Sequence, residues 1–141
     1  MKGGLLVVLA VAAGLTGCQT LRNISEERDS RNVEFGHAWI SDQMFPAEIN
    51  VVGSWTSRDW GEASLSQTDR VVKGQVGDYP VDGVVSGAKV YLLASHGGRY
   101  VYSIVLEMPS PNLLIGYYSR SIPYQSSNRR HIRLDRRSNQ L

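Results

Sequence analysis

The chain has 141 residues, with 15 Lys and Arg against 13 Asp and Glu and a formal net charge of +2. This near-neutral balance points to no nucleic-acid partner, and the length suits one domain better than two. The chain has one cysteine, Cys18, which excludes a disulfide framework and a Cys-ligated zinc site. The fold must therefore be held together by its core, without covalent cross-links.

The first 18 residues have the pattern of a bacterial export signal. Lys2 gives a positive start, and residues 5–17 form an apolar and small-residue run that is too short to span a bilayer. The run ends in Leu15-Thr16-Gly17-Cys18, which resembles the lipobox of bacterial lipoprotein precursors. The resemblance implies cleavage before Cys18, a diacylglycerol on its thiol and acylation of the new amino terminus. The alternative is an ordinary signal peptide with an incidental cysteine.

The lipobox resemblance has consequences for location and chemistry. Residues 1–17 would be the signal peptide, and three acyl chains would hold Cys18 to a membrane stably, since two or more chains suffice. Gln19, rather than Asp, follows the cysteine, which resembles proteins sorted to the outer membrane. We therefore expect a lipid anchor in the outer membrane with the domain facing the periplasm, the inner membrane or the cell surface being alternatives. A lipidated Cys18 also excludes thiol catalysis.

Residues 18–50 are predicted to be a lipidated tether. Ser25 to Asn32 has no apolar residue and many charges, which is typical of a solvated segment. Val33 to Phe45 fits both a strand alternation and a helical stripe, and we favour a short helix or loop packed against the domain.

Residues 51–141 are predicted to form an all-β domain, a small antiparallel meander or up-and-down barrel of about eight short strands. Short β-rich runs recur between turn residues such as Gly97-Gly98 and Pro109-Ser110-Pro111-Asn112. The expected strands are Val51–Ser57, Gly61–Ser66, Val71–Val76, Val81–Ser86, Lys89–Ala94, Arg99–Glu107, Leu113–Ser119 and His131–Arg137.

The alternation of apolar residues predicts which strand faces are buried. Tyr100, Tyr102, Ile104 and Leu106 are expected on one face of their strand. Apolar residues also occupy the opposite face of this strand. We therefore expect the Arg99–Tyr118 region to be central, or to be covered from outside by the segment from Phe35 to Phe45.

Gly53-Ser54-Trp55 opens the first predicted strand and resembles the start of lipocalins, avidins and related calycin-like barrels. The resemblance implies that Trp55 closes one end of the barrel and that an arginine of the last strand, Arg130 or Arg133, covers it. Residues 51–137 are fewer than in a typical lipocalin, which leaves little room for a ligand cavity.

Sequence motifs of catalysis are missing: there is no Gly-x-Ser-x-Gly, no His-Glu-x-x-His and no phosphate-binding glycine loop. We therefore expect no enzyme activity, no cofactor and no metal. Asp78 and Asp82 could ligate calcium, but their neighbours favour a role as turn formers.

Five tyrosines lie on three neighbouring predicted strands and could form a binding platform for a sugar or a partner: Tyr91, Tyr100, Tyr102, Tyr117 and Tyr118. The arginine-rich end is the other place where binding residues are expected. The candidates for partner binding are Tyr91, Tyr100, Tyr102, Arg129, Arg130 and Arg133. Ordinary strand filling and a solvated last strand are the plainer interpretations.

The expected function is a non-catalytic partner-docking, assembly or structural module. It would be attached to the membrane at Cys18 and have an envelope protein as its partner. The alternatives are a binder of a small apolar or glycan ligand and an inhibitor of a cell-wall hydrolase, since Ser86-Gly87-Ala88-Lys89 resembles the inhibitory loop of membrane-bound lysozyme inhibitors.

Overall fold

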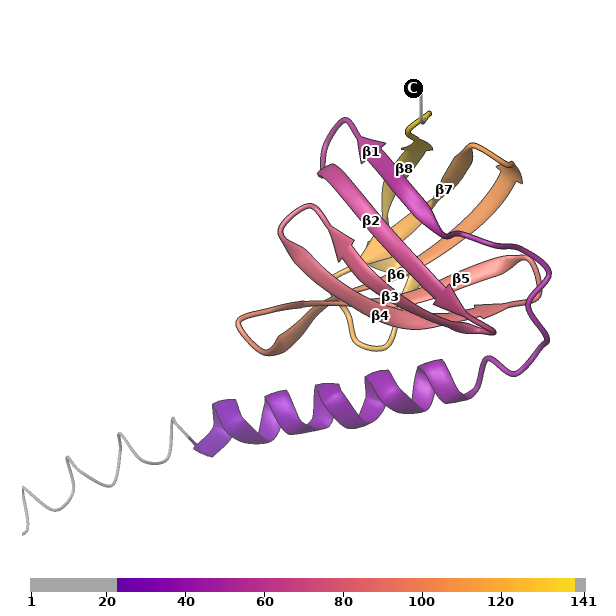
Figure 1. Cartoon of the computed structure of the whole chain (residues 1–141). Helices are drawn as coiled ribbons and strands as arrows, with labels where there is room; N and C mark the ends of the chain where they lie inside the picture. The colour runs from indigo at the N-terminus through magenta and orange to yellow at the C-terminus, as the bar shows by residue number, and fades with distance from the viewer. Residues whose placement is uncertain (1–22, 139–141) are drawn as a thin grey trace, which may run out of the picture. The chain divides into compact units, whose positions relative to one another are not determined.

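The computed structural model describes residues 23–138 (Figure 1). The predicted signal peptide, the lipobox and Cys18 therefore lie outside the described residues. The chain divides between Arg31 and Asn32 into two units, and the second unit contains all of the strands.

The second unit is built on a closed antiparallel barrel of eight strands (Figure 1). Each strand pairs with the next along the chain, and β1 closes the barrel by pairing with β8. The strands are β1 (Gly53–Ser57), β2 (Gly61–Thr68), β3 (Val71–Val76), β4 (Tyr79–Ser86), β5 (Lys89–His96), β6 (Arg99–Ser110), β7 (Leu113–Ser119) and β8 (Arg130–Arg136).

The prediction of an all-β, up-and-down barrel is confirmed. The bounds of β3 and β7 match the predicted strands residue for residue, and the other strands differ by up to three residues at either end. The glycine pair between β5 and β6 explains one sharp reversal, because Gly97 and Gly98 have φ of 61° and 79°. Such positive φ values are readily adopted only by glycine.

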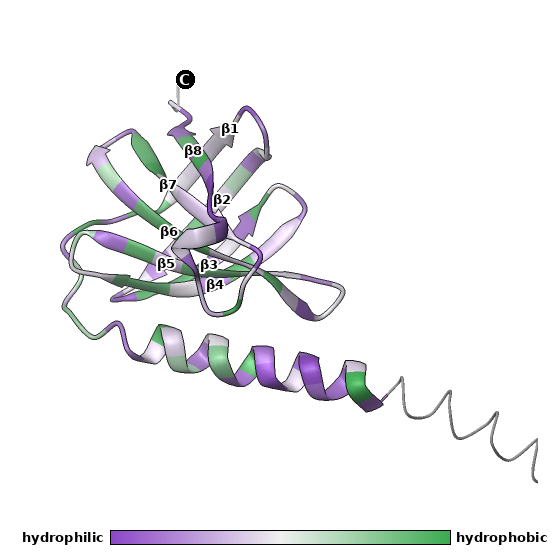
Figure 2. Cartoon of the chain, turned by 180° about the vertical axis from the view of Figure 1, so that it is seen from behind, coloured by the Kyte–Doolittle hydropathy of each residue, from purple (hydrophilic) through white to green (hydrophobic). Residues whose placement is uncertain are grey.

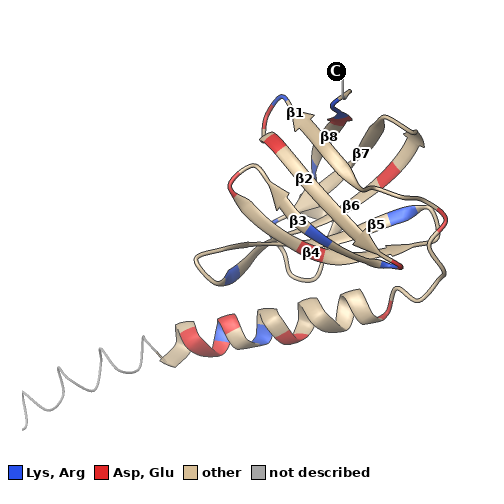
Figure 3. Ribbon diagram, viewed as in Figure 1, with Lys and Arg blue, Asp and Glu red and all other residues tan. Residues whose placement is uncertain are grey.

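Residues 23–41 are helical, including the polar run of residues 25–32 that composition predicts to be a tether. The short helix expected within residues 33–45 therefore extends back through residues 23–32, and the role of residues 18–50 as a tether stays a prediction. Glu26, Glu27 and Arg31 are good helix formers, and Glu27 lies four residues before Arg31, the favourable order for a pair on one helix face. Acidic and basic residues alternate along this part of the helix, which carries few hydrophobic residues (Figures 2 and 3).

The last turns of this helix pack on the outer face of the barrel. A Cβ added to Gly36 would lie 3.0 Å from Leu93 Cδ1, so glycine permits the close approach of helix and strand. Leu93 is fully buried although it points out of the barrel. The sequence predicts that the segment from Phe35 to Phe45 covers the outer face of Arg99–Tyr118; its helical part contacts Tyr100 of that region through His37, but Gly36 packs on Leu93 of β5.

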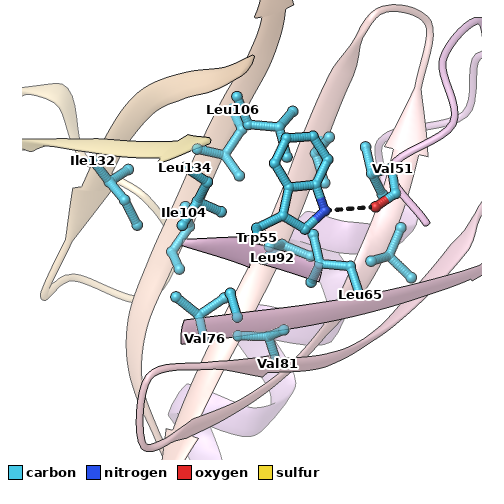
Figure 4. Close-up of a cluster of buried hydrophobic side chains, with 14 of the residues drawn as sticks. Val51, Trp55, Leu65, Val76, Val81, Leu92, Ile104, Leu106, Ile132 and Leu134 are labelled. Carbon is cyan, nitrogen blue, oxygen red and sulfur yellow. Dashed lines mark hydrogen bonds between the residues drawn. The ribbon is translucent and has the colours of Figure 1, made fainter. Parts of the chain in front are cut away.

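The barrel interior is filled by apolar side chains (Figure 4), and hydrophobic and hydrophilic residues alternate along much of the strands (Figure 2). Trp55 is the largest of them and is fully buried, and its indole Nε1 donates a hydrogen bond to the Val51 carbonyl at 3.0 Å. Around it lie Leu65, Val72, Val76, Val81, Val85, Val90, Leu92, Ile104, Leu106, Leu114, Ile132 and Leu134. The interior is a packed core of side chains.

The prediction that Tyr100 and Tyr102 share a face is wrong. Ala94 of β5 pairs with Tyr102, whereas the next residue, Ser95, pairs with Tyr100, so Val101 is an extra residue in β6. Because of this extra residue, the residues of β6 before the bulge point to the opposite face of the sheet from the one that simple alternation predicts. Tyr102 therefore packs with rings at the barrel end, whereas Tyr100 lies on the outer wall.

An arginine of β8 covers Trp55, but it is neither Arg130 nor Arg133. Trp55 is paired with Arg136, whose guanidinium carbon lies 4.3 Å from the Trp55 ring centroid. Arg133 points to the opposite face of the strand and pairs with Asp135, and Arg130 lies opposite Tyr118 near the other end of β8. Arg130 and Arg136 are both at even positions of β8, on the same strand face as Ile132 and Leu134. Only the β1–β8 register shows that Arg136 is the arginine beside Trp55.

Candidate functional site

Two of the predicted binding residues, Tyr91 and Tyr100, lie on the outer wall beneath the helix. The Trp39 ring packs edge-on against Tyr91 with ring centroids 5.6 Å apart. His37 Nε2 lies 3.0 Å from the Tyr100 hydroxyl. Both tyrosines are thus engaged within the molecule, and their role in the structure is to hold residues 32–41.

Tyr100 also joins His37 to an acidic side chain of β4. Its hydroxyl donates a hydrogen bond to Asp82 Oδ2 at 3.4 Å. Burial raises the pKa of Asp82 above its usual value, and burial together with the Asp82 charge raises the pKa of Tyr100. Asp82 therefore belongs to a series of hydrogen-bonded side chains on the outer wall, with Tyr100 and His37. Asp78 lies apart from it, in the turn before β4. In residues 23–138, no three or more His, Cys, Asp or Glu side chains group closely enough to hold a metal ion.

Two of the predicted arginines also have partners within the molecule. The guanidinium carbon of Arg129 lies 3.9 Å from the Tyr117 ring centroid. Arg133 forms an exposed ion pair with Asp135, with 3.0 Å between nitrogen and oxygen. Of the six predicted partner-binding residues, Tyr102 and Arg130 are the pair that the structure brings to one site.

That site is a cluster of four rings at one end of the barrel, which we call the aromatic end: Trp60, Tyr79, Tyr102 and Tyr118. Trp60 lies at its centre, with its ring centroid 4.9 Å from Tyr118 and 5.4 Å from both Tyr79 and Tyr102. All three contacts are edge-to-face, the arrangement that aromatic pairs favour. The four side chains are partly buried and pack against the core.

The strand order explains why these residues meet. In an up-and-down barrel, alternate connections lie at the same end. Trp60 lies in the β1–β2 turn, Tyr79 begins β4, Tyr102 lies near the start of β6 and Tyr118 is near the end of β7. The connections at residues 58–60, 77–78, 97–98 and 120–129 therefore surround one end of the barrel (Figure 1).

Beside the aromatic end lies a hollow of about 170 Å³. Its walls combine two rings of the aromatic end with two cations and an amide: Tyr102, Tyr118, Arg120, Asn128 and Arg130. Arg120 lies close enough to the cluster to act on it electrically. The Tyr102 hydroxyl raises the pKa of Tyr79, and the Arg120 charge opposes that rise.

The loop that carries Arg120 and Asn128 is held by hydrogen bonds between side chains and backbone. The hydroxyl of Ser119, which is almost fully buried, donates to Asn128 Oδ1. Asn128 Nδ2 donates to Ser121 Oγ at 2.8 Å, and buried Ser103 Oγ donates to the Ser121 carbonyl at 2.7 Å. The amide of Asn128 is thus oriented before any ligand binds.

Most residues of this site are absent from the predicted set. Trp60, Tyr79, Arg120 and Asn128 lie in or beside three separate connections of the chain and match no motif, whereas Tyr118 is among the tyrosines of the predicted platform. The available signal was their position at the ends of predicted strands, next to alternate turns. Collecting aromatic and basic residues from every second turn would have found the site.

The loop that resembles a hydrolase-inhibiting loop is engaged within the molecule. Gly87 donates its backbone N–H to the Pro46 carbonyl and accepts a hydrogen bond from the Glu48 N–H at 2.9 Å. The Ser86 hydroxyl accepts a hydrogen bond from the Phe45 N–H, and Lys89 forms an ion pair with Glu107. These contacts hold residues 86–89 in place, and the inhibitor alternative stays a prediction.

Comparison with known proteins adds no family. No protein-family model, curated protein or solved structure matches the chain. In the part of the chain that the structure describes, no helix is both long and apolar enough to cross a membrane.

Proposed function

We propose that this protein is a lipid-anchored lipoprotein of the bacterial envelope whose barrel is a non-catalytic binding module, and that the module docks its partner at the aromatic end. The anchor would be Cys18, and the expected location is the outer membrane with the barrel in the periplasm. The support for the anchor is the Leu15–Cys18 lipobox and the apolar run before it.

The aromatic end is the observation that carries the binding part of this proposal. Tyrosine, tryptophan and arginine are the residue types that dominate binding hot spots, and here they gather around one hollow. The barrel interior holds the apolar core, whereas the hollow lies at the end of the barrel, which supports docking there. A ligand or partner would therefore contact the end of the barrel.

Site-specific photo-crosslinking in whole cells tests this proposal. A photoreactive amino acid at Arg120 or at Arg129 should crosslink to one defined envelope component, identified by mass spectrometry. The matched control positions are Lys73 and Lys89, which are exposed on the barrel away from the aromatic end. Crosslinks of equal yield and composition from all four positions would contradict docking at the aromatic end.

A further inference from the structure

We infer that the hollow beside the aromatic end binds an oxyanion, a carboxylate or a phosphate, carried by a ligand about the size of one sugar unit. The inference rests on the proposed function, since it names the chemical group that the aromatic end recognises. It is argued from the partners of the arginines, the rigidity of the hollow and its size.

The arginines of the last 22 residues divide into two groups. Four of them have a partner within the molecule: Arg129 on the Tyr117 ring, Arg133 with Asp135, Arg136 on the Trp55 ring and Arg137 with Glu62. The other two, Arg120 and Arg130, form no ion pair with any carboxylate of residues 23–138, and both line the hollow. The two arginines that have neither an ion pair nor a ring contact thus line the same hollow.

The walls of the hollow contain no acidic residue. The carboxylate of Asp78 raises the pKa of Tyr79 through its charge, but Asp78 lies outside the lining of the hollow. Two guanidinium groups therefore set the local charge. Guanidinium groups favour carboxylate and phosphate because their planar donors match the geometry of these anions.

The hollow is prepared for a ligand by its neighbours. Asn128 is fixed through Ser119 and Ser121, and one of the two hydrogens of its Nδ2 remains after the bond to Ser121. The rings of Tyr102 and Tyr118 are fixed by each other and by Trp60, with centroids 5.4 Å apart between the tyrosines. Rigid donors lose little entropy on binding, which favours a compact ligand.

The size of the hollow limits the ligand. Sites for drug-sized molecules occupy roughly 300–1,000 Å³, and this one has about 170 Å³. It fits an anionic group and the ring that bears it. Larger polymers would place one terminal or side-chain unit there.

Heteronuclear NMR on the full mature chain in neutral detergent micelles tests the inference. The probes are inorganic phosphate, glucose 1-phosphate and galacturonate, with galactose as the neutral control. We expect saturable shifts of the Asn128 side-chain amide and of the Arg120 and Arg130 Nε–H signals with the anions and none with galactose. Comparing the three anions shows whether phosphate or carboxylate is preferred and whether the sugar contributes.

Arg120→Gln and Arg130→Gln should each weaken anion binding at least about tenfold, because each removes a positive charge and its charge-assisted hydrogen bonds to the anion. The matched control is Arg133→Gln, which removes an exposed arginine of the same strand and should leave binding unchanged. An unaltered Tm and unaltered core signals would show that each variant is folded.

Three results would overturn the inference: shifts that never saturate, equal weakening by Arg133→Gln, or equal binding of galactose. These results are separable from the proposed function. If crosslinking from Arg120 persists while no anion binds, docking at the aromatic end stands and the oxyanion site falls. If anions bind but no crosslink forms, the oxyanion site stands and docking of a partner at the aromatic end falls.

Discussion

The guanidinium of Arg136 lies over the indole of Trp55, 4.3 Å from its ring centroid, and joins the last strand to the first. Arg136 also donates hydrogen bonds to the carbonyls of Pro111, Val52 and Asn50, which belong to the β6–β7 turn and to the entry into β1. One side chain therefore fastens three separate segments around the end of the barrel that is opposite the aromatic end.

Arg136→Ala should destabilise the barrel by about 1–3 kcal/mol, through the lost cation–π contact and the carbonyls left without a donor. Urea unfolding measures the change. Arg137→Ala is the control, because its exposed ion pair with Glu62 should contribute at most about 1 kcal/mol. Equal, small effects of both variants would show that Arg136 contributes no more than a surface arginine.

Trp55→Ala should cost about 3–5 kcal/mol because it opens a cavity in the core. A domain of this size has only about 5–15 kcal/mol of stability, so the variant should be close to unfolding. Trp60→Ala should cost clearly less, since Trp60 is partly exposed at the aromatic end. A urea melt in which Trp60→Ala is the more damaging variant would contradict this assignment of core and site.

Gly36→Leu should separate residues 32–41 from the barrel, because even a Cβ at this position would lie 3.0 Å from Leu93 Cδ1. Fluorine NMR with fluorotryptophan should show the Trp39 signal moving to its solvent-exposed position while the Trp55 signal stays. Ala38→Leu introduces the same side chain at an exposed helix position and should change neither signal. An unmoved Trp39 signal in Gly36→Leu would mean that the contact tolerates a large side chain.

Asp82→Asn should stabilise the protein at neutral pH. Burial raises the folded-state pKa of Asp82 above its ordinary value of 3.8, so its carboxyl group favours folding when protonated. The favourable contribution is present below about 3.8 and is lost as pH rises through the folded-state pKa. The gain from Asp82→Asn should therefore be full at pH 7 and vanish in acid. Asparagine can still accept the Tyr100 hydrogen bond.

Asp135→Asn is the matched control of opposite sign. The hydrogen bond from Arg133 lowers the pKa of Asp135, so its charged form favours folding. Urea melts at pH 7 should show no stabilisation by this variant. Stabilisation by both variants would point to a general effect of removing negative charge rather than to the burial of Asp82.

Cys18→Ser should leave a precursor that carries no lipid, because no thiol remains for the diacylglycerol. Metabolic labelling with a fatty-acid analogue followed by membrane fractionation measures this. Label retained on the Cys18→Ser protein would contradict the lipobox interpretation, and label absent from the unsubstituted protein would contradict it as well.

The strands could be predicted because two local signals agree, alternation of apolar residues and glycine or proline at the turns. Val71–Val76 shows alternation and is followed by Gly77, whereas Leu113–Ser119 is bounded mainly by the Pro109–Asn112 turn before it, and both were located residue for residue. The polar helix could not be predicted from these signals. Residues 25–32 contain no apolar residue, and charged residues at helical spacing are equally typical of a solvated coil.

The candidate site depends on properties that local patterns do not contain. The choice of Arg136 over Arg130 required the β1–β8 register, and the separation of Tyr100 from Tyr102 required the extra residue Val101 in β6. The aromatic end required the order of the strands around the barrel. Tyr102 and Arg130 could be proposed from residue type alone, but their neighbours Trp60 and Arg120 could not.

The short pairing between β1 and β8 determines where the barrel opens locally. Trp55 with Arg136 and Thr56 with Asp135 are the paired residues of this seam, whereas every other strand pair extends over five or more pairs. The seam also joins segments distant in the chain, so it must offset a larger loop entropy than any hairpin. We expect backbone amide hydrogens of β1 and the end of β8 to exchange with solvent first, and the barrel to unzip there as an open sheet before it unfolds.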